Sequence, residues 1–150
     1  MANTYTCLHY HFVFSTKNRE PWITPAVEDR IWAFLGGIAR KNRMTPLQIG
    51  GIEDHIHLVA GMAPTVAPAD AVQLLKGGSS HWIHKTLPGF LSFAWQDGYG
   101  AFAVSKSGLP EVIRYVETQR ERHRARTFQE EYRALLDKHQ INYDERYLWG

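Results

Sequence analysis

The feature that most constrains this chain is an alternation of polar and apolar residues that begins at His55. The run from His55 to Ala60 (HIHLVA) contains two histidines separated by one apolar residue. Successive side chains of a β-strand point to opposite faces, so His55 and His57 would share one face, and Ile56 and Leu58 the other. The run therefore predicts a strand with an apolar core behind it. Two imidazoles held side by side on a strand also supply half of a metal site.

The rest of the chain predicts strands and helices around this run. Residues 4–16 and 44–52 alternate in the way that is typical of strands, with a turn at 50–54 leading into the strand at 55–62. Apolar residues at helical spacing predict helices at 24–41, 70–87, 109–124 and 128–139. The order β-α-β-β-α-β-β-α-α indicates an α+β fold: an antiparallel sheet with helices packed mainly on one face, related to ferredoxin-like folds.

Two glycine-containing segments predict local features. Asp97-Gly98 separates residues 93–95 from 99–104, which predicts a β-hairpin with its turn at this pair. Gly77 and Gly78 lie inside the helix expected at 70–87. Glycine is unfavourable in a helix interior, so we expect either a kink or a close contact with a neighbour there.

Length and composition limit the class of protein. A chain of 150 residues with 44% hydrophobic residues is long enough for one domain with a real core, here residues 1–150, with 127–150 as a C-terminal helix and aromatic tail. Cys7 is the single cysteine, which excludes an internal disulfide and suits a reducing cytoplasm. No apolar run approaches the roughly 18 residues of a membrane helix. We therefore expect a soluble cytoplasmic domain that does not enter a membrane.

The helix expected at 109–124 carries two side chains suited to chemistry. Tyr115 and Gln119 are one helical turn apart on the flank of the apolar stripe, so they can reach the same point in space. Tyr115 is a candidate nucleophile, and the Gln119 amide oxygen is a candidate ligand for a hard cation. The alternative for Tyr115 is a packing residue. His123 lies two turns beyond Tyr115 and would either assist this pair or lie at the surface.

Basic and small polar residues are candidates for contacts with phosphate, although a net charge of +2 does not by itself indicate a polyanionic partner. They are Lys17, Arg19, Lys76, Ser79, Ser80, Arg120, Arg122 and Arg124. The alternative for the arginines is a solvated helix face paired with neighbouring glutamates. His9 and His11 are either ordinary strand residues or part of the functional face.

Together, His55, His57, Tyr115 and Gln119 resemble the motif of the single-tyrosine HUH transposases, the small insertion-sequence transposases that include the group associated with repetitive extragenic palindromes (REP). Other segments, such as residues 95–100, 127–131 and 143–149, are similar to family segments. The resemblance extends from about Tyr5 to Trp149.

This resemblance implies an HUH-type fold and a reaction. His55, His57 and Gln119 would bind Mg²⁺ or Mn²⁺. Tyr115 would attack a phosphate of single-stranded DNA at ends marked by a hairpin, leaving a 5′-phosphotyrosine and a 3′-OH that can later rejoin strands. It also implies a homodimer in which active sites can be shared in trans. The order of the four residues leaves cis or trans docking of Tyr115 open, as well as the metal and the hairpin sequence.

Two other function classes remain open. A domesticated relative would bind hairpin DNA or RNA without cutting it, although such a protein would not need all four of these residues. A phosphoesterase would use histidine or water, rather than Tyr115, as its nucleophile. A covalent adduct between DNA and Tyr115 distinguishes the transposase from both.

Overall fold

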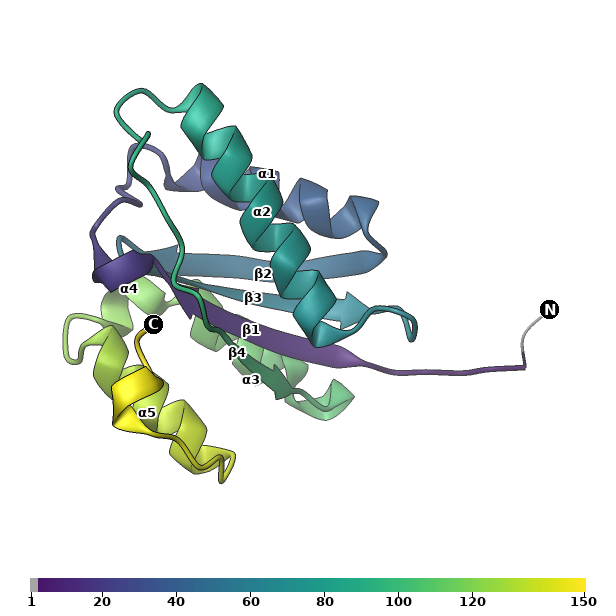
Figure 1. The fold of residues 1–150 in the computed structure, drawn as a ribbon. Helices are drawn as coiled ribbons and strands as arrows, with labels where there is room; N and C mark the ends of the chain where they lie inside the picture. Colours follow the sequence, from purple (N-terminus) through teal and green to yellow (C-terminus); the bar gives the residue numbers. More distant parts are fainter. Residues whose placement is uncertain (1–2) are drawn as a thin grey trace.

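A four-stranded antiparallel sheet forms the centre of the molecule in a computed structural model, which describes residues 3–150. The first two residues of the predicted domain lie outside this description. The strands are β1 (His9–Ser15), β2 (Met44–Ile52), β3 (His55–Met62) and β4 (Gly100–Ala103). Their order in the sheet is β2-β3-β1-β4, so β3 and β1 are central (Figure 1).

The hairpin of β2 and β3 has the bounds that the alternation predicts. Pro46 lies in β2, an edge strand, where a missing backbone N–H is tolerated, and the register shifts between Pro46 and Gln48. β1 pairs with β3 along its full length, with Val13 opposite His57 and Ser15 opposite His55. The strand that carries both histidines is therefore hydrogen-bonded on both sides and held rigidly.

One face of the sheet is apolar and is covered by the two longest helices, α1 (Glu28–Lys41) and α2 (Pro68–Thr86). Phe12 and Phe14 of β1 and Ile56 and Leu58 of β3 are fully buried against these helices. A Cβ added to Gly78 of α2 would lie 2.8 Å from the Ile38 Cδ1 atom. α2 runs through both glycines without a break, so neither marks a kink, and Gly78 serves a close helix contact.

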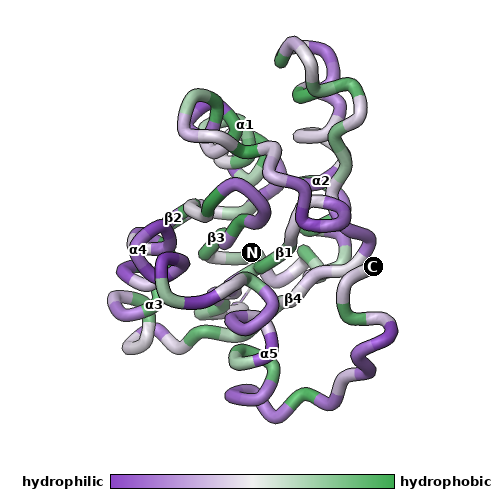
Figure 2. Tube along the Cα trace, turned by 90° about the vertical axis from the view of Figure 1, so that its left-hand side faces the viewer, coloured by the Kyte–Doolittle hydropathy of each residue, from purple (hydrophilic) through white to green (hydrophobic). Residues whose placement is uncertain are grey.

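The opposite face is covered by three shorter helices, α3 (Leu109–Glu117), α4 (Gln119–Arg122) and α5 (Phe128–Lys138). The sheet lies between the two helical layers, with α1 at the top and α5 at the bottom of Figure 2, where α4 is hydrophilic along its length. The α+β class and the antiparallel sheet are confirmed. The expectation that helices lie mainly on one face needs refinement, because α3 to α5 cover the second face with a mixed polar and apolar layer.

The helix predicted at 109–124 is two helices, because the backbone leaves helical geometry at Thr118 (φ −103°, ψ 25°). The helix predicted at 128–139 is present as α5 and begins with a capping box between Thr127 and Glu130. Beyond α5, Trp149 returns to pack against Phe128 and Tyr132. The C-terminal tail therefore completes the apolar cluster to which α5 contributes Phe128 and Tyr132.

The hairpin predicted around Asp97-Gly98 is wrong. The segment runs on along β1: Trp95 bridges Thr16, and β4 then pairs with residues 10–13 of β1. The Lys76 ammonium donates hydrogen bonds to the carbonyl oxygens of Gln96, Asp97 and Gly98 at 2.7, 3.2 and 2.6 Å, which holds the bend between the two pairings. Pairing with a strand of an existing sheet is more favourable than an isolated two-stranded hairpin, which is marginal in water.

None of the helices described between residues 3 and 150 is long and apolar enough to cross a membrane.

Candidate active site

The two histidines of β3 are fully buried on the face of the sheet that α3, α4 and α5 cover. Their Nε2 atoms point to the same oxygen, Oε1 of Glu131 on α5, at 3.4 Å from His55 and 3.1 Å from His57. The alternation along β3 accounts for this placement, because Ile56 and Leu58 between and beyond the histidines are buried on the opposite face.

Tyr115 and Gln119 lie in the same cluster. The Gln119 Oε1 atom is 3.0 Å from His55 Nε2, and the amide nitrogen of Gln119 donates to the carbonyl oxygen of Tyr115 at 3.2 Å. The Tyr115 hydroxyl donates a hydrogen bond to the Glu131 Oε2 atom. One chain therefore brings together His55, His57, Tyr115 and Gln119, although α3 ends between Tyr115 and Gln119.

Glu131 is the member of the cluster that the sequence motif does not contain. Its carboxylate is completely buried, and donor atoms of His55, His57 and Glu131 all lie within 4.8 Å of one another. The sequence does carry a signal for this residue. Glu131 falls in the apolar stripe of α5 with Phe128, Tyr132 and Leu136, and a charged residue in such a stripe is rarely buried without a partner.

Two further histidines support the cluster. The His123 side chain is only 3% exposed, and its Nε2 atom is 3.0 Å from Gln119 Oε1 and 3.1 Å from Glu131 Oε1, so a position at the surface is excluded. His11 is buried in β1, with its Nε2 atom 2.7 Å from Nδ1 of His57. Such a contact to the second ring nitrogen fixes the tautomer and the orientation of an imidazole. His9 lies outside the cluster, near Cys7.

The charges in the cluster follow from its burial. Burial lowers the pKa of His57, and Glu131 only partly opposes this effect. Burial and the repulsion of His57 lower the pKa of His11 well below its usual value. Burial alone would raise the pKa of Glu131, but the charge of His57 and hydrogen bonds from His123 and His57 outweigh it and hold the pKa of Glu131 well below its usual value. The cluster thus holds an ionised carboxylate at neutral pH.

The pKa of Tyr115 is shifted in the opposite direction. Burial, and then the negative charge of Glu131, raise the pKa of the Tyr115 phenol well above its usual value. The phenol is therefore protonated at neutral pH while Glu131 is the nearest charge. A positive charge near the Glu131 carboxylate would instead lower the pKa of the Tyr115 phenol.

The donor atoms of the cluster fit a divalent metal ion. Nδ1 of His55 lies 2.7 Å from the Asp54 carboxylate, so in the neutral ring this nitrogen carries the hydrogen and Nε2 presents a lone pair. That lone pair faces two oxygens, of Gln119 at 3.0 Å and of Glu131 at 3.4 Å. Lone pairs that face one another need a cation or a proton between them. Imidazole nitrogen together with carboxylate and amide oxygen suits Mn²⁺ and tolerates Mg²⁺.

The predicted phosphate contacts divide into a group outside α2 and a group on α2. In the first group, Lys17 and Arg124 are exposed, and Arg120 pairs with Glu28 and Glu53 at 3.2 and 2.9 Å. The Arg122 guanidinium lies 4.6 Å from the centroid of the Tyr115 ring. Arg19 lies over the ring of Trp149. Of these residues, Arg122 is in direct contact with the candidate nucleophile.

The other group lies on α2, on the face of the sheet away from the cluster. The prediction for Ser79 is wrong: this residue is buried, donates to the Leu75 carbonyl oxygen at 2.6 Å and accepts from the Trp95 indole at 2.9 Å. Lys76 is likewise engaged by the three carbonyl groups of the bend before β4, so its ammonium has a structural role. Ser80 is half-buried on the same helix.

Comparisons with known proteins bear on the family and the fold. A family model described as "Transposase IS200 like" matches residues 4–119, a range that ends before His123 and Glu131. A crystal structure of a candidate transposase from Deinococcus radiodurans is similar to this chain, with 25% identity over 79% of this chain and 95% of that one and a TM-score of 0.67. A REP-associated tyrosine transposase bound to a REP hairpin shares the fold, with 12% identity, coverage of 82% and 73%, and a TM-score of 0.60. A search of curated proteins found no match.

Proposed function

The chain belongs to the IS200-like transposase family, and from this premise we propose that it cleaves and rejoins single-stranded DNA at hairpin-marked ends through a covalent bond to Tyr115. The observation that carries the proposal is the position of the Glu131 carboxylate. One of its oxygens faces His55 and His57, and the other accepts the hydrogen bond of the Tyr115 hydroxyl. The candidate metal ligands and the candidate nucleophile are therefore joined through one side chain.

The residues of the cluster would have distinct roles. A divalent ion held by His55, His57, Glu131 and Gln119 would supply positive charge that polarises the scissile phosphate and makes the phenolate accessible near neutral pH. The Glu131 carboxylate is placed to orient the Tyr115 hydroxyl, and the phenol proton would pass to water as the phenol oxygen attacks phosphorus. A bond forms between the Tyr115 oxygen and phosphorus, and the bond from phosphorus to the 3′ oxygen breaks as that oxygen takes up a proton from water. Attack by a 3′-OH on the phosphotyrosine reverses these changes and rejoins strands.

Cleavage in cis is supported by the contacts of Tyr115. Its hydroxyl is bonded to Glu131 of the same chain, and its ring lies with its centroid 5.6 Å from that of His57. One chain thus brings together every residue to which this proposal gives a role in the reaction. A homodimer with tyrosines exchanged in trans stays a prediction from the family resemblance.

The DNA partner is proposed from the family and from the surface around Tyr115. A structural neighbour is bound to a REP hairpin, and we propose a hairpin with a single-stranded flank for this chain as well. Arg122 and Arg124 extend from Tyr115 along and beyond α4 and are placed to contact phosphates of the flank. Lys17, Arg19 and Arg120 are more distant contacts in the same proposal.

The test is a gel assay with end-labelled single-stranded hairpin DNA from the flanks of the source gene, run under denaturing conditions that preserve covalent adducts. With Mn²⁺ or Mg²⁺ we expect a labelled band at the mass of protein plus DNA fragment. Tyr115→Phe keeps the ring but loses the nucleophile, so the adduct should fall at least about a thousandfold. DNA fragments released by Tyr115→Phe at the wild-type rate would instead support a phosphoesterase. A shift on a native gel without any adduct would support a binding protein.

A further inference from the structure

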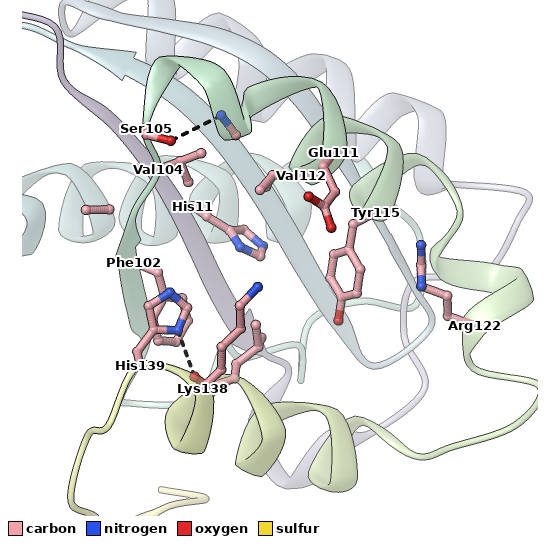
Figure 3. Close-up of a pocket in the computed structure, with 13 residues that line it drawn as sticks. His11, Phe102, Val104, Ser105, Glu111, Val112, Tyr115, Arg122, Lys138 and His139 are labelled. Carbon is pink, nitrogen blue, oxygen red and sulfur yellow. Dashed lines mark hydrogen bonds between the residues drawn. The ribbon is translucent and has the colours of Figure 1, made fainter.

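A cavity of about 380 Å³ opens beside Tyr115 and has no role in the reaction described above. It lies between β4, α3 and α5 (Figure 3). In the close-up, the side chains of His11, Phe102, Tyr115 and Lys138 converge on this space from β1, β4, α3 and α5. Its volume is within the range of sites that take small molecules.

The cavity shares two walls with the candidate active site. His11 contacts His57 with its Nε2 atom, and its ring is 6.1 Å from the Phe102 ring in the cavity. The Tyr115 ring lies 6.2 Å from His11, and its hydroxyl bonds to Glu131 on the side of the histidine cluster. A base in the cavity would therefore lie beside the Tyr115 ring, whose hydroxyl would attack the phosphate, so the base and the phosphate would be close neighbours on one DNA strand.

The lining has the chemistry that recognises an unpaired nucleotide. The Phe102 and His139 rings stack at 4.5 Å between centroids, and the exposed His139 provides a flat platform at the mouth. Lys138 and Arg122 bring positive charge to the same space, and Glu111 offers an acceptor. Aromatic platforms combined with cations are how proteins hold single-stranded nucleic acid. A base paired in a duplex could not enter such a cavity.

We propose that this cavity holds the base of the nucleotide next to the phosphate that Tyr115 attacks. The inference rests on the proposed function and adds its substrate requirement: an unpaired, extruded nucleotide directly beside the cleavage point. Stacking at His139 and Phe102 would hold the base, and Arg122, which lies over the Tyr115 ring, would contact the phosphate between base and tyrosine.

Photocrosslinking tests the inference without knowledge of the hairpin. The probe is a single-stranded DNA library of random sequence in which 5-iodouracil replaces thymine. We expect irradiation to join the DNA to peptides that contain Phe102 or His139, in wild type and in Tyr115→Phe alike. Val112→Phe, which fills the cavity, and Lys138→Glu should each lower this crosslink at least about fivefold, the loss expected for one stacked base. Lys41→Glu, the same change of charge at the exposed end of α1, should leave it unchanged.

The outcomes separate this inference from the proposed function. A Tyr115 adduct without crosslinks in the cavity would overturn the inference and leave the proposed function intact. Crosslinks in the cavity without any adduct would support the nucleotide site while the cleavage proposal failed. Crosslinks that Val112→Phe and Lys138→Glu both leave at wild-type yield would overturn the inference. Lys138 is exposed at the end of α5, so its variant remains informative even where Val112→Phe does not fold.

Discussion

The two faces of the sheet are made by the same strands and differ in almost every property. Towards α1 and α2, β1 and β3 present Phe12, Phe14, Ile56 and Leu58, and the layer is apolar. Towards α3, α4 and α5, β1 and β3 present the histidines at 11, 55 and 57, which meet a buried glutamate and glutamine. Neighbouring residues of one strand thus serve different purposes. One face provides stability, and the other carries a polar cluster whose burial costs stability unless its groups find partners.

The sharpest test of this division is a substitution that affects the apolar face alone. Leu58→Ala leaves a cavity between β3 and the two long helices, and should lower the free energy of unfolding by about 2 to 5 kcal/mol. Urea unfolding measures this loss. The affinity for Mn²⁺ should stay within about threefold of wild type, because Leu58 and the histidines lie on opposite faces. A much larger loss of Mn²⁺ affinity would show that the two faces are coupled.

The second test affects the polar face alone. Mn²⁺ at a hundred times its dissociation constant should raise the free energy of unfolding by about 2.7 kcal/mol, because the ion binds only the folded chain. Thermal unfolding with and without Mn²⁺ measures the increase, which Leu58→Ala should retain. In His57→Ala the increase should disappear at the same Mn²⁺ concentration. A full increase in His57→Ala would place the ion elsewhere.

A third test concerns the charge within the polar cluster. Glu131→Gln keeps the shape of the side chain but removes its charge, so Mn²⁺ affinity, measured by calorimetry, should fall about 10- to 100-fold. In the metal-free protein the pKa of Tyr115, which burial and the Glu131 charge raise, should move down. Ultraviolet titration would then show phenolate forming at lower pH than in wild type, with Tyr115→Phe as the reference that identifies the signal. An unchanged titration would contradict the contact between Glu131 and Tyr115.

The smallest expected effect lies at the start of the helix that carries Glu131. Thr127→Ala removes the N-cap of α5 and should cost about 1 kcal/mol of unfolding free energy. Because only the end of α5 is weakened, Mn²⁺ affinity should fall less than in Glu131→Gln. Thr86→Ala, at the exposed end of α2, serves as a matched control and should change neither quantity. Equal losses in the two variants would show that the cap of α5 has no special role.

Much of this arrangement could be predicted from local sequence. The bounds of β2 and β3 follow from the alternation of polar and apolar residues. Because alternate residues of a pleated strand share a face, the sequence alone could place His55 and His57 on the same face of β3. Helical spacing also brought Gln119 close to Tyr115. The break at Thr118 was not predicted, yet the Gln119 side chain still turns back to the Tyr115 carbonyl group.

The remaining features depend on contacts between distant segments. Glu131 meets His57 across 74 positions of sequence, and no local pattern states which strand the buried side of α5 will face. The turn signal at Asp97-Gly98 failed for the same reason, since β1 offers the segment a partner that a local pattern does not include. Ser79 was predicted to contact phosphate as a small polar residue, but the close helix contact at Gly78 and the hydrogen bond from the Trp95 indole account for the small residues there.

The position of Glu131 in the last helix has a consequence for the chain during its synthesis. Protein chains emerge from the ribosome with the N-terminal end first and begin to fold in that order. Both histidines of β3 and Tyr115 emerge before α5, so an incomplete chain can hold the candidate nucleophile and two candidate metal ligands without the carboxylate that joins them. A nascent or prematurely terminated chain that ends before residue 131 therefore lacks the full cluster, and under the proposed function such a chain would not cleave DNA.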